Sequence, residues 1–493
     1  MDDPLRSRLS ESNSAALIPY DRPSVTPGIV HLGVGAFHRA HMAAYIDDLL
    51  SGDPSWGIVG ASLRRPDTLR ALAPQDFLYT LVTRSGSETK CRVIGALIGV
   101  LHSGSRHREL LRTMTDPRTR IVSLTITEKG YCHDPATGRL SLAHPAIVHD
   151  LATPDAPLSA PGLLCRALEL RRTAGVIPFT VLSCDNLPEN GRTTAAIVTE
   201  FAAQHDEELA RHINTEVAFP STMVDRIVPA TTDEDRMNVV EETGRYDAWP
   251  VVTEPFTQWV MEDRFTAGRP KFETAGVELV ADVRPYEIMK LRMLNGGHSM
   301  LAYLGYLAGF EFVSDTVADP AFRDLARDFM NAEVMETLPS GTGDPGAYCD
   351  MLLERFANPA LRHRTWQIAM DGSQKLPQRL LGTIQDRLRL GLPISRGALA
   401  VAAWMRYVSG IDETGREIDV RDPLSRRLRA IARAGGDPAN MVDGFLQVRE
   451  VFGETLARDP EFRAALIGHL ESLLHRGAAQ TVRSLAQGGT FAC

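Results

Sequence analysis

The sequence predicts an α/β fold in which a domain built on a parallel sheet is followed by a mostly α-helical domain. In the first part of the chain, short apolar runs rich in β-branched residues alternate with helical patterns, which is typical of a parallel sheet with crossover helices. After about Pro285 this alternation stops and helical periods dominate. A chain of 493 residues is also too long for a single core. We therefore expect two domains, residues 1–283 and residues 284–493.

The strands of the first domain are predicted from four apolar runs at residues 28–33, 56–62, 120–127 and 178–184, with a helix expected at residues 40–50. The last two runs end where polar residues gather, at Glu128-Lys129-Gly130 and at Asp185-Asn186. In an open parallel sheet, ligands bind beyond the carboxyl ends of the strands. These two strand ends are therefore the first place to look for a functional site.

The helices of the second domain are predicted from apolar periodicity at residues 287–308, 319–336, 348–357 and 396–409, followed by several shorter helices. Asp319-Pro320 is a good helix start, because a capping side chain is followed by proline at the first helical position.

The bulk composition excludes several classes of protein. The net charge of −9 argues against a general nucleic-acid binder. No window is long and apolar enough to span a bilayer, and the first 20 residues hold no apolar signal core. Six scattered cysteines without a C-x-x-C pair, and no assembled set of zinc ligands, fit a reducing cytoplasm and predict no metal. We expect a cytoplasmic monomer or small homo-oligomer that binds a small molecule.

A glycine turn follows the first predicted strand and precedes the first predicted helix. This is the setting that a dinucleotide-binding fingerprint requires. Gly33 permits the tight turn, and Gly35 lets backbone N–H groups approach a pyrophosphate. His38 stands where a third glycine is usual. The turn therefore predicts a Rossmann-type domain.

The residues after the second strand leave the choice of cofactor open. Asp67 could accept the ribose hydroxyls, which favours NAD, whereas Arg64 or Arg65 could meet a 2′-phosphate, which favours NADP. We expect NAD, with NADP not excluded. Arg39 is expected near the phosphate, and its neighbours His38 and His41 are interpreted as structural histidines rather than a metal pair.

The segment at residues 290–298 carries Lys290, Asn295 and His298 inside a helical pattern. At roughly 100° per residue, these side chains project at about 0°, 140° and 80°, so they share one side of a helix. Apolar neighbours surround the lysine, and burial lowers the pKa of an amine until it becomes a usable base. By itself, a polar stripe that faces water explains the same spacing.

Four motifs occur together along the chain, at residues 33–41, 127–131, 183–186 and 290–298: G-x-G-x-F-H-R-x-H, T-E-K-G-Y, S-C-D-N and K-x4-N-x2-H. The set resembles the mannitol dehydrogenase family, the polyol-specific long-chain dehydrogenases that work without zinc. The resemblance runs from about Gly28 to the last helices. Within the family, the stretches around residues 128–132, 290–296 and 361–379 look most similar to the fructuronate reductase (D-mannonate oxidoreductase) branch.

The resemblance implies reversible hydride transfer between a nicotinamide and C2 of an open-chain sugar acid or alcohol. It implies that Lys290 is the base, for which the free pKa of about 10.4 must fall by roughly 2–3 units. Asn186 and Asn295 would donate hydrogen bonds to the C2 oxygen. His298 would orient the substrate, and Glu128 would exchange the proton of the lysine with solvent. Phe37 joins the expected cofactor-binding residues.

The substrate is expected to carry a carboxylate, as D-mannonate and D-fructuronate do, because basic residues gather near the site motifs. The basic stretch that supplies candidates consists of Arg362, His363, Arg364, Lys375 and Arg379, and Lys129 is a further one. Of these, Lys129, Arg364 and Lys375 are the residues expected to bind the carboxylate. A solvated basic face explains the same run of charges, and a neutral polyol such as mannitol needs none of them. The alternative is therefore a mannitol 2-dehydrogenase or a related polyol dehydrogenase. A nucleotide-sensing protein without chemistry is a further rival, but it has no need for Lys290.

Overall fold

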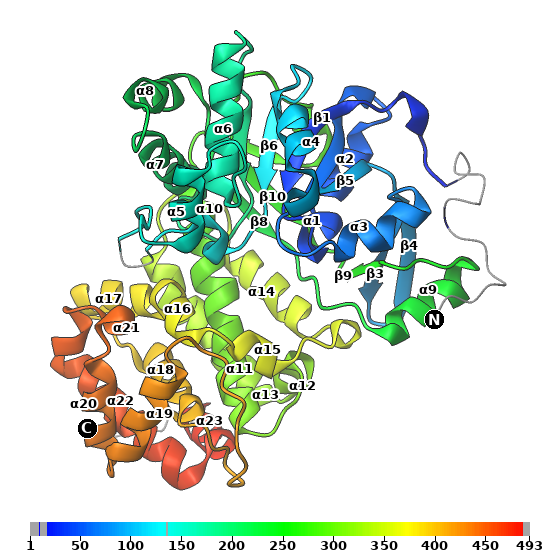
Figure 1. Ribbon diagram of the computed structural model, residues 1–493. Helices are drawn as coiled ribbons and strands as arrows, with labels where there is room; N and C mark the ends of the chain where they lie inside the picture. The colour runs from blue at the N-terminus through cyan, green and yellow to red at the C-terminus, as the bar shows by residue number, and fades with distance from the viewer. Residues whose placement is uncertain (1–8, 10–16, 135–136, 487–493) are drawn as a thin grey trace. The chain divides into compact units, whose positions relative to one another are not determined.

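The computed structural model describes residue 9 and residues 17–134 and 137–486. The chain divides into two compact units, Met1–Arg284 and Pro285–Cys493 (Figure 1).

The first unit is built on a five-stranded sheet in the order β5-β2-β1-β6-β7, and every pairing in it is parallel. Its strands are β1 (Pro27–Leu32), β2 (Gly57–Ser62), β5 (Leu97–His102), β6 (Ile121–Leu124) and β7 (Thr180–Ser183). Ile29, Val30 and Leu32 are fully buried although neighbours in a strand face opposite sides of the sheet. Burial on both faces explains why these strands read as unbroken apolar runs. The predicted parallel α/β architecture is confirmed.

Helices and two smaller sheets complete the first unit. The helices are α1 (Ala36–Ala40), α2 (Met42–Leu49), α3 (Asp67–Leu72), α4 (Ser103–Thr115), α5 (Pro145–Ala152), α6 (Ala160–Thr173), α7 (Asn190–Ala202), α8 (Glu207–Glu216) and α9 (Asp233–Thr243). One small sheet joins β4 (Glu88–Ile94), β3 (Tyr79–Ser85) and β9 (Val251–Thr253). The other joins β11 (Glu278–Val280), β10 (Gln258–Glu262) and β8 (Thr222–Asp225).

The predicted bounds in the first unit differ from the observed ones by one or two residues at most strand ends, and two elements differ more. The strand expected at residues 120–127 ends at Leu124, because the backbone N–H groups of Ile126 and Thr127 donate to the carboxylate of Asp185 instead of a neighbouring strand. The helix expected at residues 40–50 is interrupted at His41, which separates α1 from α2 and has φ −114° and ψ −92°.

The described part of the second unit is mostly helical and contains none of the named strands, as the apolar periodicity predicts. Its elements are α10 (Arg284–Met289), π-helix η7 (Lys290–Asn295), α11 (Gly296–Leu307), α12 (Val313–Ala318), α13 (Pro320–Asp328), π-helix η8 (Phe329–Val334), α14 (Pro345–Phe356), α15 (Thr365–Ala369), α16 (Gly372–Leu376), π-helix η11 (Pro377–Leu381), α17 (Gly382–Arg389), α18 (Ser395–Val408), α19 (Ser425–Ala434), α20 (Pro438–Leu446), α21 (Arg449–Phe452), α22 (Pro460–Arg476) and α23 (Ala478–Ala486). Asp319 caps α13 by accepting from Ala321 N at 2.9 Å, so the predicted helix start is confirmed.

The core of the second unit surrounds α11 and α18, which pack against each other. Nearly every residue of both helices is buried. A helix that is apolar all round belongs inside a core, and these two form the centre on which the shorter helices pack.

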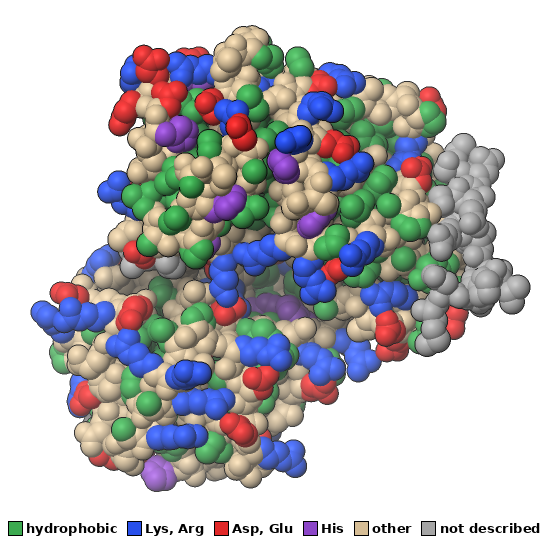
Figure 2. All heavy atoms as spheres, in the orientation of Figure 1, with side chains coloured by type: hydrophobic (Ala, Val, Ile, Leu, Met, Phe, Trp, Pro, Cys, Tyr) green, Lys and Arg blue, Asp and Glu red, His purple; other side chains and the backbone are tan. Residues whose placement is uncertain are grey.

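The described surface carries charges of both signs. On the face shown in Figure 2, acidic and basic side chains are interspersed among apolar areas. The large apolar side chains that are exposed are scattered along the chain: Leu142, Val148, Leu158, Ile177, Met237, Leu390, Ile411 and Leu474. Within the described ranges, no helix combines the length and the apolar character that crossing a membrane requires.

Candidate active site

The glycine turn between β1 and α1 has the backbone shape that its sequence predicts. Gly33 has φ +97°, and a Cβ there would lie 2.2 Å from the carbonyl oxygen of Thr125, so only glycine fits. A Cβ on Gly35 would meet no atom of the chain closer than 3.8 Å, which leaves that side of the turn open. Thr68 in α3 donates to the carbonyl of Val34 at 3.1 Å and ties the turn to the next crossover. The turn is thus fixed from within and open toward a ligand.

Two buried histidines support this turn. The Nε2 atom of His31 lies 2.8 Å from Thr125 Oγ1 and 3.3 Å from the carbonyl oxygen of Gly33, and its Nδ1 atom lies 2.8 Å from Ser123 Oγ. His38 stacks on the His31 ring at 3.5 Å between centroids. Burial lowers the pKa of His31 to about 3 and that of His38 well below its usual value. Both rings are therefore neutral. His38, at the position where a third glycine is usual, packs on β1 through the His31 ring.

The other residues expected to bind the cofactor make the following contacts within the first unit. Asp67 begins α3 and forms an ion pair with Arg65 at 2.7 Å near the surface. Arg39 is 3 % exposed; its guanidinium donates to the carbonyl of Trp249 and lies 5.3 Å from the centre of the Tyr79 ring. These contacts give Arg39 a structural role. Phe37 stacks on the His41 ring at 5.0 Å.

The described ranges contain no cluster of three or more His, Cys, Asp or Glu side chains arranged to hold a metal ion. His41 Nε2 lies 2.9 Å from the carbonyl oxygen of Gln258, and His38 stacks on His31. Each of the two histidines in the 38–41 segment therefore has a structural role.

The two polar strand ends lie on neighbouring strands, because β6 and β7 pair in parallel. Glu128 and Lys129 begin the 3-10 helix η5 (Glu128–Tyr131) after β6, and both are exposed. Asn186 is also exposed, in the turn after β7. Asp185, to which sequence reasoning gave no role of its own, joins the two ends by accepting hydrogen bonds from Ile126 N and Thr127 N, both at 2.9 Å.

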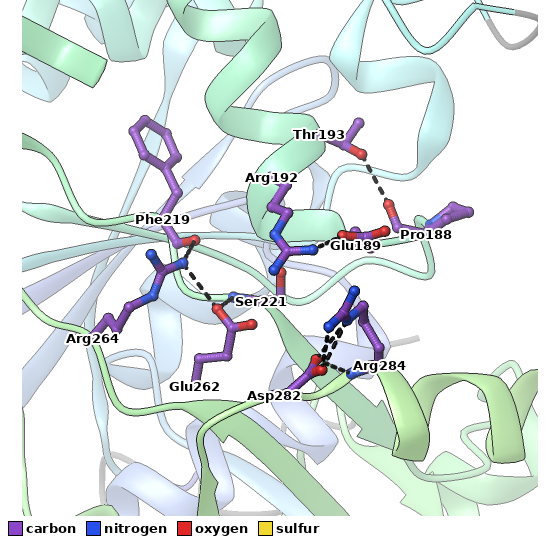
Figure 3. A network of polar contacts seen from close by, with 10 residues as sticks. All are labelled: Pro188, Glu189, Arg192, Thr193, Phe219, Ser221, Glu262, Arg264, Asp282 and Arg284. Carbon is purple, nitrogen blue, oxygen red and sulfur yellow. Dashed lines mark hydrogen bonds and ion pairs between the residues drawn. The ribbon is translucent and has the colours of Figure 1, made fainter. Parts of the chain in front are cut away.

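The turn that carries Asn186 is anchored on its far side by the start of α7. Asn190 donates through Nδ2 to the carbonyl of Asp185 at 3.0 Å. Figure 3 shows two further anchors: Thr193 donates to the carbonyl of Pro188 at 2.9 Å, and Arg192 pairs with Glu189. The ion pair between Asp282 and Arg284, 2.6 Å long, lies in the same view, where the first unit ends. Hydrogen bonds and an ion pair with the start of α7 therefore hold the turn that carries Asn186 in place within the first unit.

In the second unit, the helix that carries Lys290 is not a regular α-helix. Residues Lys290–Asn295 form the π-helix η7, so the spacing of 100° per residue expected from the sequence is wrong for this segment. Hydrogen bonding from i to i+5 places residues five apart nearly one above the other. Lys290 and Asn295 therefore share a face more closely than an α-helix would allow. Both are buried, as is His298 in α11.

His298 lies among aromatic and cationic side chains of the second unit. Its ring stacks on Phe356 at 4.9 Å and meets the edge of His363 at 4.8 Å. Burial, followed by the charges of His363, Arg379, Arg355 and Lys375, holds the pKa of His298 well below its usual value. His298 is therefore a neutral hydrogen-bonding group.

The cations near His298 match the basic residues that the sequence favours only in part: Lys375 is among them, and Arg364 is not. Arg355 of α14 is buried, and nothing in its sequence context marks it. Arg379 of η11 donates to Ser299 Oγ at 3.1 Å, next to His298. Lys375 donates to the carbonyl of Met370 at 2.5 Å. Arg364, by contrast, pairs with Glu311 at 2.9 Å at the surface, and its side chain is 54 % exposed.

The buried neutral histidines predict a protein that loses stability in mild acid. Burial lowers the pKa of His469 to about 4 and that of His363 to about 4, as it does for His31, His38 and His298. The unfolded chain binds protons near pH 6.5 while the folded chain does not, so stability is present above that pH and is lost as the pH falls. Each such histidine contributes a loss of about 2 kcal/mol between pH 7 and pH 5.

Thermal unfolding followed between pH 5 and pH 8 checks this expectation. We expect Tm to drop steeply below pH 6.5 and the drop to be smaller in His469→Gln. The matched variant His205→Gln, at an exposed histidine, should leave the profile unchanged. Asp185 acts in the opposite sense, because burial raises its pKa to about 6 and its contribution is lost as the pH rises through that value. Equal Tm values at pH 5 and pH 7 would contradict the expectation.

Comparison with known proteins places this geometry in a family. Residues 27–274 match the family model described as the mannitol dehydrogenase Rossmann domain, and residues 282–474 match the mannitol dehydrogenase C-terminal domain. The chain is 48 % identical over 466 residues to the Escherichia coli oxidoreductase YeiQ, which covers 94 % of this chain and 95 % of that protein. It is 46 % identical over 480 residues to the D-mannonate oxidoreductase of the same organism, with 95 % and 98 % covered.

The similarity extends to three-dimensional structure. The structure of Pseudomonas fluorescens mannitol 2-dehydrogenase, a ternary complex with NAD and D-mannitol, superposes with a TM-score of 0.88 at 41 % identity, covering 95 % of this chain and 96 % of that one. The resemblance expected from the four sequence motifs is thereby confirmed. The chain belongs to the mannitol dehydrogenase family of oxidoreductases.

Proposed function

We propose that this protein transfers a hydride between NAD and C2 of an open-chain sugar acid, with D-fructuronate as the ketone and D-mannonate as the alcohol; C2 of D-fructuronate is the carbon numbered C5 in D-mannonate. The relative named D-mannonate oxidoreductase, 46 % identical over nearly the whole chain, supports the proposal. The observation that carries the choice of an acid is the group of cations around His298 in the second unit. In this proposal, residues 1–283 bind the dinucleotide and residues 284–493 supply the base and the contacts to the substrate.

The glycine turn fits a dinucleotide. Gly33 holds the tight turn, and the open side of Gly35 leaves room for a pyrophosphate to approach its backbone. Asp67, at the start of α3, would accept the ribose hydroxyls, whereas its ion-pair partner Arg65 would bind the 2′-phosphate of NADP. When bound, the nicotinamide accepts or donates the hydride. The P. fluorescens mannitol 2-dehydrogenase structure is a complex with NAD, which supports the choice of NAD.

The chain's own residues would handle the proton and the developing charge. Lys290, buried among apolar neighbours, would take the C2 hydroxyl proton during oxidation and return it during reduction. Asn186 and Asn295 would donate amide hydrogen bonds to the C2 oxygen as its negative charge grows. His298, held neutral, would orient the substrate by hydrogen bonding. Glu128, exposed at its strand end, would pass the proton to solvent.

The carboxylate of the substrate would bind to cations of the second unit. Two guanidinium groups and an amine lie close enough to His298 to lower its pKa: Arg379, Arg355 and Lys375. Guanidinium groups bind carboxylates through paired charge-assisted hydrogen bonds. Lys129, after the end of β6, would be a further cation for the carboxylate. Arg364 is the weakest of the candidates from the sequence, because its guanidinium already pairs with Glu311.

The second candidate function is that of a mannitol 2-dehydrogenase. The structural similarity to the P. fluorescens enzyme supports it, since that structure contains D-mannitol. The reaction, the base and the hydrogen bonds to the C2 oxygen would be the same, and only the group at the far end of the substrate would differ.

One panel of substrates tests the proposal. The values of kcat/KM are measured for reduction of D-fructuronate, D-tagaturonate, D-fructose and D-xylulose, each with NADH and with NADPH. We expect D-fructuronate with NADH to give the highest value, and activity to persist after treatment with a metal chelator. A higher value for D-fructose would establish the mannitol alternative. No turnover of any ketone would favour a nucleotide-sensing protein, and loss of activity with chelator would contradict a zinc-free mechanism.

A further inference from the structure

The carboxylate of Asp185 has an arrangement of partners that secondary structure alone does not require. Both of its oxygens accept hydrogen bonds: Oδ2 from Ile126 N at 2.9 Å and from the Tyr131 hydroxyl at 2.8 Å, and Oδ1 from Thr127 N at 2.9 Å. All three donors belong to the segment that follows β6, whereas Asp185 follows β7. A single side chain therefore ties together the ends of two neighbouring strands.

The segment that Asp185 holds has a strained backbone. Thr127 has φ +63° and ψ 162°, a region of conformational space that is essentially restricted to glycine. A threonine keeps this conformation only where its surroundings fix it. The two N–H groups that bind Asp185 are those of Thr127 and the residue before it. Glu128 follows directly and begins η5, so its place depends on this conformation.

Asp185 is also directly bonded to Asn186 along the chain. Asn186 is the next residue after Asp185, in the turn that Asn190 closes by donating to the Asp185 carbonyl at 3.0 Å. Burial raises the pKa of Asp185 to about 6, hydrogen bonds oppose the shift, and the charge of Glu128 adds to it, which indicates that the two carboxyl groups lie near each other. Asp185 thus lies between the two residues of the first unit to which the proposed reaction assigns a role.

We propose that Asp185 is a positioning residue for the reaction: it fixes Glu128 and Asn186 relative to each other by clamping the ends of β6 and β7. It acts through those two residues and not on the substrate or the cofactor. The inference rests on the proposed function, because the roles of Glu128 and Asn186 come from it. The clamp itself is a physical claim about the segment 126–131 and is open to test without any substrate.

The first experiment is the substitution Asp185→Asn in the full chain. An amide has one accepting oxygen, so it is unable to accept from all three donors, and its NH₂ group would face a backbone N–H. We expect kcat for the preferred ketone to fall about 10- to 100-fold, as a misplacement of about 1 Å can produce. KM for NADH should stay within about threefold, because the glycine turn is untouched. A variant that is folded and keeps kcat within about twofold of the wild type would overturn the proposal.

The matched control is Asp150→Asn. Asp150 also accepts from two backbone N–H groups and one hydroxyl: Leu158 N at 2.7 Å, Ser159 N at 2.8 Å and Ser159 Oγ at 2.6 Å. It lies in α5, and its backbone donors are Leu158 and Ser159 rather than residues of the segments that follow β6 and β7. We expect this variant to lose stability but to keep kcat within about twofold. If both variants lost kcat equally, the loss would be a general result of removing a buried carboxylate from this unit. That outcome would contradict the positioning role of Asp185.

Amide hydrogen exchange separates the failure of this inference from the failure of the proposed function. Exchange in the segment 126–131 should become faster in Asp185→Asn and stay unchanged in Asp150→Asn, whatever substrate the protein uses. If the wild type reduces no ketone but exchange responds in this way, the clamp holds and only the proposed reaction fails. Unchanged exchange overturns the clamp. Should Asp185→Asn not fold, Tyr131→Phe removes one of the three donors, and we expect it to lower kcat about three- to tenfold and to speed exchange in the same segment.

Discussion

Replacing Lys290 with alanine is expected to lower kcat for the preferred ketone by about 10²- to 10⁴-fold, which is the contribution of a positioned general acid or base. Lys290 is buried in π-helix η7, close to Asn295 along the same face. The expected loss follows because no other described residue takes the role of proton acceptor in the proposed reaction. Titration of NADH binding by fluorescence should give nearly the same Kd as the wild type, because the lysine belongs to the second unit.

The control for this variant is Lys271→Ala, since Lys271 is an exposed lysine of the first unit outside the proposed site. It should keep kcat unchanged. The dependence on pH gives a second, independent readout. The rate of alcohol oxidation should rise with pH through one apparent pKa below that of free lysine and then level off, and this step should vanish in Lys290→Ala. His298 adds no step there, because burial holds its pKa well below the usual value. Retained turnover in Lys290→Ala would end the case for a lysine base.

The parts of the fold that follow from short-range chemistry could be predicted from the sequence. The strand β1 and the glycine turn could be found because an apolar run must be buried and because the backbone at Gly33 excludes any side chain. The start of α13 could be found because Asp319 caps it before a proline. The family could be recognised because its four motifs occur together and in the same order along the chain.

The features that sequence reasoning missed depend on partners far along the chain. The early end of β6 requires Asp185, a residue 59 positions after Ile126. Lone charged residues such as Arg355 carry no local signal, because their burial is decided by the packing of α14. The π-helix η7 escapes prediction because the apolar residues of this segment suit an α-helix equally well. Gly296 follows the π-helix directly, and a Cβ there would lie 2.7 Å from the carbonyl oxygen of Arg379. The end of η7 therefore packs closely against η11, a contact that is far away in sequence.

The expected substrate-binding residues could likewise be predicted only in part, because the sequence shows which residues are basic but not which of them pack near His298. The sequence offers Lys129, Arg364 and Lys375 because they lie near recognised motifs. In the structure, Lys375 lies near His298, whereas Arg364 is paired with Glu311 at the surface. Arg379 belongs to the same basic stretch of the sequence, but its place beside His298 depends on its hydrogen bond to Ser299, and so on how η11 packs against α11.

The substitution Arg379→Met is expected to separate acid substrates from neutral ones. If Arg379 binds the substrate carboxylate, kcat/KM for D-fructuronate should fall about 10- to 100-fold, because a hydrogen bond between charged groups contributes about 1.5–3 kcal/mol. D-fructose differs from D-fructuronate in having a hydroxymethyl group in place of the carboxylate, so its kcat/KM should change less than about threefold. The measurement is the ratio of the two kcat/KM values in the wild type and in each variant.

Two further arginine variants determine which residue is responsible. Arg364→Met tests the candidate from the sequence, and we expect a change of less than about twofold for both ketones, since its guanidinium already pairs with Glu311 at 2.9 Å. Arg421→Met is the neutral control, because Arg421 lies at the surface and pairs with Asp419 at 2.9 Å. A selective loss of D-fructuronate activity in Arg364→Met instead of Arg379→Met would show that Arg364, the arginine expected from the sequence, binds the carboxylate. Equal losses for both ketones in Arg379→Met would mean that this residue supports His298 and Ser299 and does not recognise a carboxylate, and the choice between a sugar acid and a neutral polyol would then favour the polyol.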